Sequence, residues 1–173
     1  MDLCHEIKMN FYCAHQLEIS ISKLLNLYGN KVDDVLLRLS LKEIGIESEK
    51  HAQYLELIGL SLGLFEKANC EEHLGSLWKD LEEMHLNLSK GVNMSPESFI
   101  DRQRWIEGAI GEETYQRLLL PLIEANIEQC RLNKDLADFV KSLLNKIIIE
   151  EKEHEELLIK LLKSKKFHKS VQN

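Results

Sequence analysis

The sequence predicts an all-α protein, and three observations lead to this prediction. Leu, Ile, Lys and Glu dominate, and apolar residues recur at three- and four-residue spacing, the period of an amphipathic helix. The 173 residues include only 8 glycines and 2 prolines, too few for a sheet protein rich in tight turns. A chain of 20.1 kDa is long enough for one domain, so we expect residues 1–173 to form a single folding unit.

Four long amphipathic segments carry the helical period, at about residues 3–29, 34–64, 96–130 and 133–164. Gly29 predicts the end of the first helix, and either Asp33 or Asp34 can cap the start of the second. The third segment begins after Ser95 and Pro96, a capping residue followed by a proline in the first turn. The fourth segment has an apolar stripe made of Val140, Leu144, Ile147, Leu158 and Leu161.

The lengths of the connections predict how these helices are joined. The first and second segments, and the third and fourth, are linked by a few residues, so each pair should form an antiparallel hairpin. Residues 65–95 are far more than a turn needs and contain a shorter polar helix at about Glu71 to Ser89. We therefore expect a four-helix bundle with a long crossover between its two hairpins.

Charge and composition exclude several classes of function. The formal net charge of −7 argues against nucleic-acid binding, because phosphate affinity needs a basic surface. The longest apolar run has six residues, Leu118 to Ile123, so no membrane span is expected. The N-terminus has no basic region followed by an apolar one, so we expect no signal peptide and a cytoplasmic location.

The four cysteines lack any CxxC pair, which excludes a rubredoxin-like or zinc-ribbon site made by this chain. Isolated cysteines are most often small core residues. Sequence alone does not assign a disulfide among Cys4, Cys13, Cys70 and Cys130.

The second and fourth segments form an internal repeat. Aligned without gaps, Leu41, Ile44, Glu47, His51, Leu55 and Ile58 fall on Leu144, Ile147, Glu150, His154, Leu158 and Leu161. Each helix thus places acidic residues three or four positions before a histidine, in the middle of an apolar stripe. Residues at this spacing share a helix face, so the carboxylate and the imidazole can bind one metal pair together.

The other two helices each offer a carboxylate at the same height. Glu18 lies at the centre of the first apolar stripe, whereas the third helix carries Glu107, Glu112 and Glu113. At about 100° per residue, Glu113 lies close to the apolar stripe, Glu112 at its edge and Glu107 on the opposite side. Glu113 is therefore the expected ligand from this helix, with Glu112 second.

A carboxylate in an apolar stripe is costly unless it is paired or holds a cation. Four helices that each place one at mid-height therefore indicate two divalent ions, of iron type, with manganese or zinc as alternatives. We expect Glu150 to be solvated, with orientation of a ligating histidine as its alternative role. The predicted metal ligands are Glu18, Glu47, His51, Glu113, Glu151 and His154.

With these residues the chain resembles the ferritin-like superfamily and, within it, the rubrerythrin-like di-iron proteins. That family carries a Glu on the first and third helices and a Glu-x-x-His step on the second and fourth, here Glu151 to His154 on the fourth. The second helix departs from the pattern, because Ser48 stands three residues before His51. Either Glu47 substitutes as a ligand, or the site is mononuclear, weak or empty.

The resemblance implies reduction of peroxide or oxygen at a di-iron centre, or oxidation of ferrous iron. It also implies an external electron donor, since no rubredoxin domain follows the bundle in this sequence. The alternatives are iron binding or storage without redox turnover, and a helical interaction module with a decayed metal site. An apolar strip on the crossover is the expected contact of a homodimer, unless it packs on the same chain's bundle: Leu74, Leu77, Trp78 and Leu81.

Overall fold

The structure is a computed structural model that describes residues 3–126 and 133–169, and within these ranges the chain is all-helical, without a β-strand. The all-α prediction is therefore confirmed. The elements in chain order are α1 (Leu3–Gly29), α2 (Val35–Leu62), α3 (Cys70–Leu74), α4 (Ser76–Ser89), α5 (Pro96–Ala109), the π-helix η1 (Ile110–Leu119), α6 (Leu120–Asn126) and α7 (Lys134–Lys169).

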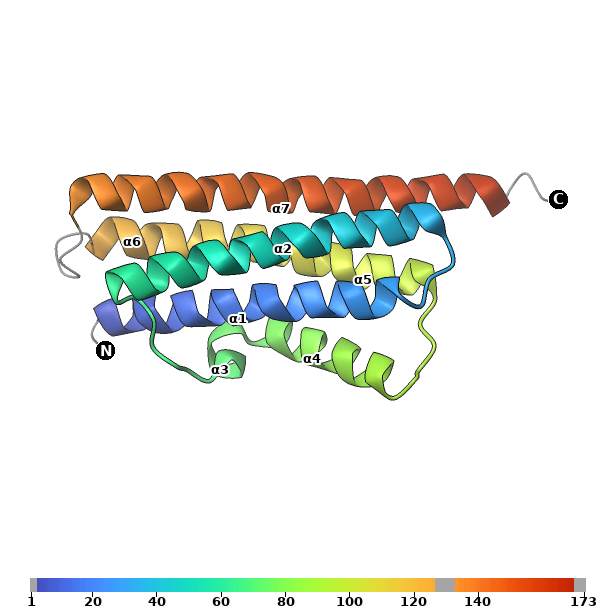
Figure 1. The fold of residues 1–173 in the computed structure, drawn as a ribbon, viewed down its shortest axis with the longest axis horizontal. Helices are drawn as coiled ribbons and strands as arrows, with labels where there is room; N and C mark the ends of the chain where they lie inside the picture. The colour runs from blue at the N-terminus through green and yellow to red at the C-terminus, as the bar shows by residue number, and fades with distance from the viewer. Residues whose placement is uncertain (1–2, 127–132, 170–173) are drawn as a thin grey trace.

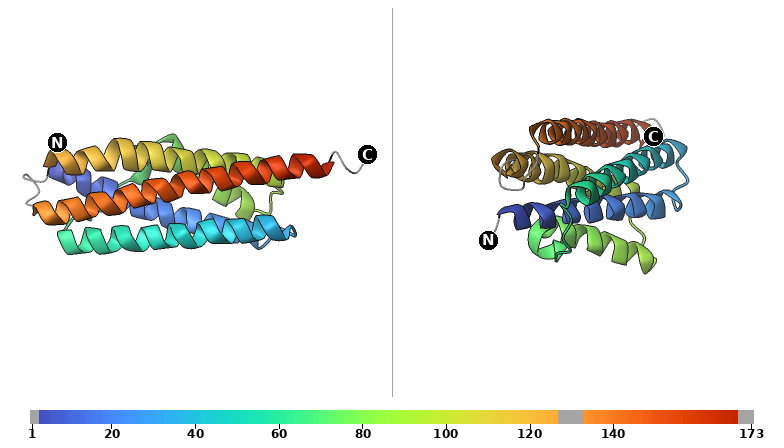
Figure 2. Two further views of the ribbon diagram at one scale, coloured as in Figure 1. Left: turned by 90° about the horizontal axis from the view of Figure 1, so that it is seen from above. Right: turned by 60° about the vertical axis from the view of Figure 1, so that its left-hand side comes forward.

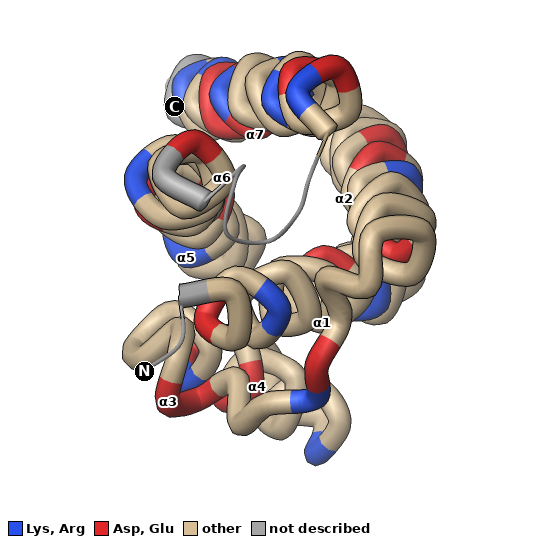
Figure 3. The backbone as a smooth tube through the Cα atoms, turned by 90° about the vertical axis from the view of Figure 1, so that its left-hand side faces the viewer, with Lys and Arg blue, Asp and Glu red and all other residues tan. Residues whose placement is uncertain are grey.

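Four long helical segments lie side by side: α1, α2, the continuous run of α5, η1 and α6, and α7 (Figure 1). The same arrangement is seen from above and from the side (Figure 2). Viewed along the axis, the four segments surround a common interior, and α3 and α4 lie outside it against α1 (Figure 3). Fully buried side chains from each segment fill this interior, among them Phe11, Leu41, Ile106 and Leu144.

Local capping explains where the helices begin and end. The Asp34 carboxylate accepts a hydrogen bond of 2.9 Å from the Leu37 amide, and Ser95 accepts one of 3.2 Å from the Ser98 amide. Gly63, at φ +63°, ends α2 in the left-handed conformation that glycine adopts without strain. The second helix thus starts at Val35 and stops two residues before the expected position 64.

The crossover contains two short helices where one was expected, because Gly75 at φ +56° breaks the segment. Leu77 and Leu81 of α4 are buried, with exposures of 5% and 1%, and α4 packs on α1. The apolar strip of the crossover therefore packs on the same chain and is not a free surface for a dimer. A disulfide between Cys13 of α1 and Cys70, with a Cα–Cα distance of 5.2 Å, attaches the start of the crossover.

The last two long segments differ from the uniform helices expected. The expected helix at 96–130 changes to π-helical geometry over ten residues, and its predicted end lies outside the described residues. Helix α7 continues five residues beyond the expected position 164. Among the described residues, no helix combines the length and apolarity that crossing a membrane requires.

Candidate metal centre

Three carboxylates and two histidines meet in the interior at mid-height of the bundle. Each of the four long segments contributes at least one of them, and none is more than 2% exposed. The five residues are Glu18 of α1, His51 of α2, Glu107 of α5, and Glu151 and His154 of α7. We call this set the central cluster.

Glu151 is the centre of this cluster. One of its oxygens, Oε1, lies 2.9 Å from Nδ1 of His51, and the other, Oε2, lies 3.8 Å from Nδ1 of His154. Glu18 Oε1 approaches His51 Nδ1 at 3.6 Å, and Glu107 Oε2 approaches His154 Nδ1 at 3.2 Å. The cluster thus consists of two groups of three residues that share Glu151, and in each group the ligand atoms lie within 4.8 Å of one another.

Two neutral side chains hold the outer carboxylates of the cluster in place. The Tyr115 hydroxyl of η1 donates a hydrogen bond of 2.5 Å to Glu18 Oε1. The Gln103 amide of α5 donates a short hydrogen bond to Glu107 Oε1. Both donors are fully buried, so each fixes its carboxylate without adding a charge.

Each histidine has a second carboxylate on its other ring nitrogen. His51 Nε2 lies 2.8 Å from Glu150 Oε2, and His154 Nε2 lies 2.7 Å from Glu47 Oε2. Glu47 and Glu150 occupy equivalent positions of the internal repeat, and each binds the histidine of the other helix. Lys50 joins the two, with its Nζ 3.0 Å from Glu150 and 3.4 Å from Glu47. The structure therefore places Glu47 on the outer side of His154, outside the central cluster in which it was expected.

The third-helix ligand is also placed differently from the expectation. Glu113 and Glu112 lie on the exposed face, where Glu112 pairs with Arg117 at 2.5 Å. Glu107, expected on the opposite side from the apolar stripe, is fully buried in the cluster. The cause is η1, because a π-helix closes its hydrogen bonds on the fifth residue and turns through a smaller angle per residue than an α-helix.

Over the ten residues of η1 the smaller rotation per residue accumulates. The side of the segment that faces the interior before η1 is therefore opposite to the side that faces it after η1. The expected stripe runs through Ile106, Ala109, Leu120, Ile123 and Ile127 at a constant rotation per residue, and it is therefore out of phase at Glu107. The signal that identifies Glu107 lies before η1: Phe99, Ile100, Gln103 and Ile106 are buried at helical spacing, and Glu107 follows on the same face.

Ser48 leaves the position equivalent to Glu151 without a carboxylate. It is fully buried, and its hydroxyl donates to the Ile44 carbonyl of its own helix at 3.1 Å. The repeat is thus asymmetric at this position, and among the described residues Glu151 is the carboxylate that faces both histidines.

The electrostatics of the cluster follow from burial and close pairing. Burial lowers the pKa of His51 and of His154, but pairing with carboxylates outweighs burial and raises these pKa values to about 11 and about 12. Burial, together with repulsion from Glu18 and Glu107, raises the pKa of Glu151 to about 8. In the absence of a metal, protons on the two imidazoles and on Glu151 at neutral pH therefore offset the negative charge of the cluster.

Several buried polar atoms of the cluster have no hydrogen bond to a neutral group and form ion pairs only within the cluster: His51 Nδ1 and both carboxylate oxygens of Glu151, while Glu18 Oε2 has no hydrogen bond. Such atoms are costly unless they bind something. Their donor types, carboxylate oxygen and imidazole nitrogen, suit iron, manganese or zinc. The outer glutamates supply the support that metal-binding histidines need on their second nitrogen. The residues present thus fit a divalent metal centre.

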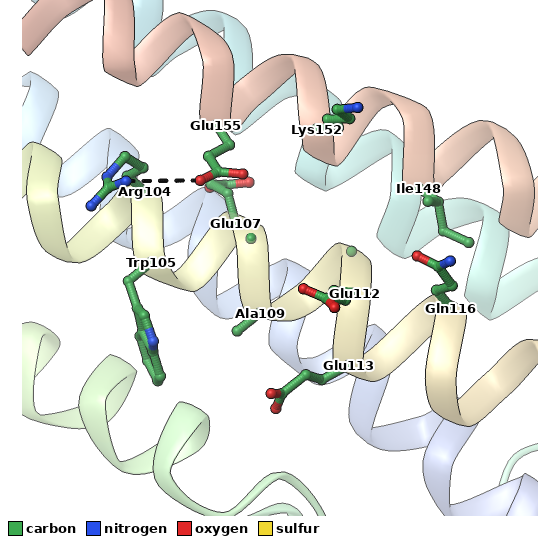
Figure 4. Close-up of a pocket in the computed structure, with 12 residues that line it drawn as sticks. Arg104, Trp105, Glu107, Ala109, Glu112, Glu113, Gln116, Ile148, Lys152 and Glu155 are labelled. Carbon is green, nitrogen blue, oxygen red and sulfur yellow. Dashed lines mark ion pairs between the residues drawn. The ribbon is translucent and has the colours of Figure 1, made fainter.

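A pocket of about 460 Å³ opens between α5–η1 and α7 and reaches Glu107 (Figure 4). An ion pair of 3.9 Å between Arg104 and Glu155 spans the two helices at this pocket. Two of its lining residues, Gly108 and Gly111, have no side chain to fill it. A Cβ at Gly111 would lie 3.1 Å from Glu151 Cβ, so this glycine also allows the close approach of η1 to α7. The pocket ends against Glu107, whose side chain stays fully buried.

Comparison of the chain with protein-family models, with curated proteins and with solved structures gives no match.

Proposed function

We propose that the protein is a ferritin-like, rubrerythrin-like metalloprotein that binds two divalent ions, iron in the first place. One observation supports this most strongly: the two oxygens of buried Glu151 face Nδ1 of two different histidines, and no neutral side chain or backbone amide donates to either of them. A carboxylate in that position costs free energy unless cations occupy both sides of it. The crossover between two helical pairs is in keeping with a ferritin-like topology.

In this proposal the first ion is held by Glu18, His51 and Glu151, and the second by Glu107, Glu151 and His154. Glu151 would contribute a ligand atom to both ions, since it belongs to both groups. Three protein residues per ion leave positions for solvent or a small substrate. Ser48, which replaces a second bridging carboxylate, keeps one side of the pair free of a charged protein ligand.

A bound iron pair would supply redox chemistry with peroxide or dioxygen, or oxidation of ferrous iron. The chain's own residues orient the ligands: Tyr115 and Gln103 hold the carboxylates of Glu18 and Glu107 by hydrogen bonds. The pocket beside Glu107 is the proposed approach for a small substrate, and the side chains of the whole cluster, Glu107 included, are buried behind it. Reduction of peroxide additionally requires an external electron donor.

One observation favours a second candidate, an interaction module without a metal. Each histidine lies between two carboxylates, so internal ion pairs can close the cluster without any ion. Charges buried in this way are retained in some proteins without any gain in stability. Metal content separates the two candidates.

The test is elemental analysis of protein reconstituted anaerobically with ferrous iron and then desalted. We expect two irons per chain, loss of both in Glu151→Gln, and no loss in Glu113→Gln, a matched change of an exposed carboxylate. Absence of bound iron in the wild-type protein, or equal iron in the Glu151 variant, would refute the metal centre.

A second measurement separates the activities. Peroxide consumption with an added chemical reductant should be sustained over many turnovers if the centre is a peroxidase. Oxidation of added ferrous iron without sustained peroxide consumption would instead support iron oxidation or storage.

A further inference from the structure

Helix α2 has a second apolar face that no residue of the described chain covers. Half of the large apolar side chains that are exposed in the described part of the chain lie on this one helix. Their exposures range from 54% to 67%, and they are Val35, Leu36, Leu39, Ile46, Leu57 and Leu60. Scattered surface leucines need no explanation, but exposed apolar residues that gather at both ends and near the middle of one helix face do.

The row follows the heptad spacing of a coiled coil. Alternating steps of three and four residues run through Leu36, Leu39, Glu43, Ile46, Lys50, Gln53, Leu57 and Leu60, which we call the α2 seam. The buried residues of α2, such as Leu37, Leu41 and Ile44, lie on the opposite side of the helix and face the interior. A helix that packs against one body needs one apolar stripe, so the second stripe indicates a second helical partner.

The α2 seam is complementary to itself when reversed. Its midpoint falls at Ser48, and each position on one side pairs with the position equally far on the other side. In an antiparallel pair of α2 helices, Leu36 would meet Leu60, Leu39 would meet Leu57, Glu43 would meet Gln53, and Ile46 would meet Lys50 of the second copy. The leucines at both ends of the seam would thus be buried against leucines, as a two-fold axis requires.

The charges on α2 select this orientation. In a parallel pair, Glu43 would face Glu43 and Lys50 would face Lys50 within the seam, which is repulsive. In the antiparallel pair these contacts disappear. On the flank of the seam, exposed Lys42 comes near exposed Glu56 of the second copy, two residues beyond the position directly opposite. Glu49 meets its own copy near the axis, where Lys50 of both chains also lies.

We propose that the protein forms a two-fold symmetric dimer through antiparallel pairing of the α2 seams of two copies. The pairing would cover Lys50, whose Nζ joins Glu47 and Glu150, the outer partners of His154 and His51. The dimer would thus shield from solvent the ion pairs of Lys50 with Glu47 and Glu150, which lie outside the central cluster. The proposal rests on the exposed face of α2 and holds whether or not a metal is bound.

Sedimentation equilibrium tests the oligomeric state. We expect the wild-type protein to have twice the 20.1 kDa mass of one chain. The double change Leu39→Glu and Leu57→Glu should give a folded monomer with an unchanged helical circular dichroism spectrum. The matched control is Phe139→Glu on α7, which has the same 59% exposure as Leu39 and should remain dimeric. A monomeric wild-type protein, or a dimer that survives the double change, would overturn the proposal.

Cross-linking tests the orientation and does not depend on a disruptive variant. Residues 39 and 57 of one chain are about 27 Å apart along the helix, too far for a disulfide within the chain. With Cys4 and Cys130 changed to serine, Leu39→Cys combined with Leu57→Cys should form a covalent dimer on oxidation, whereas neither single change should. A covalent dimer from Leu39→Cys alone would indicate parallel pairing and would overturn the proposal.

Discussion

Replacement of Glu107 by glutamine tests the metal centre most directly. The change keeps the shape of the side chain and its contact with Gln103, but it removes a negative charge that lies 3.2 Å from His154 Nδ1 in a fully buried position. Glu107 belongs to only one of the two ligand groups, because Glu18, His51 and Glu151 form the other. We therefore expect Glu107→Gln to bind one metal ion per chain instead of two.

The magnitude follows from the position of Glu107 in direct contact with the proposed ion. Loss of a residue that only orients a ligand lowers metal affinity by about 10–100-fold. Loss of the ligand itself should exceed the upper end of this range, which corresponds to more than about 2.8 kcal/mol of binding free energy at that position. Titration with zinc against a competing chelator measures this change without redox chemistry.

The control variants change Glu113 and Glu112, the two acidic residues that a regular α-helix was expected to turn towards the interior. Glu113→Gln and Glu112→Gln change exposed carboxylates of the same segment and should leave both the stoichiometry and the affinity as in the wild-type protein. If Glu113→Gln removed one metal and Glu107→Gln did not, Glu113 would be the ligand from the third segment, and the assignment of Glu107 to the cluster would be refuted.

Three further outcomes are expected. Glu47→Ala should lower metal affinity by roughly 10–100-fold and keep two metals bound, whereas His154→Ala should abolish binding more completely; equal metal content in wild type and the His154 variant would refute the ligand assignment. Carboxylate pairing raises the pKa values of His51 and His154 from 6.5 to about 11 and about 12, so their stabilisation of the metal-free fold is present below pH 6.5 and is lost as pH rises towards those values. Metal competes with these protons, so the difference in Tm between zinc-loaded and metal-free protein should grow with pH; a difference independent of pH would contradict the pairing. Reduction of the Cys13–Cys70 disulfide, which spans 57 residues, should lower the free energy of unfolding in urea by up to about 4 kcal/mol, and Cys13→Ser should abolish this response to reductant.

The internal repeat shows how much of the candidate centre can be predicted from sequence. Glu151 and His154 lie three residues apart on one face, and their helix aligns with that of His51, so the spacing alone indicates a common site. Glu18 follows from its place among apolar neighbours on the first helix. These four predicted residues are brought together in the structure because helical periodicity is a local property, and burial of one face then directs them to the interior.

Residue spacing did not reveal which carboxylates touch which histidine. Glu47 and Glu150 each precede a histidine on their own helix by four residues, yet each binds the histidine of the other helix, at 2.7 and 2.8 Å. The partner is decided by the distance and rotation between α2 and α7. Such a relation depends on the packing of the whole bundle and has no signature in either helix alone.

The chain's sequence by itself determined the all-helical class, the helix cap at Ser95, a cap at either Asp33 or Asp34, and the two histidines of the candidate site, because each depends on residues within a few positions of one another. Only the tertiary structure decided that Glu107 and not Glu113 faces the cluster. The ten π-helical residues of η1 rotate α5, which precedes them, relative to α6, which follows them. It likewise decided that Cys13 meets Cys70, 57 residues away. Both outcomes depend on how distant segments pack, and packing is a property of the assembled fold.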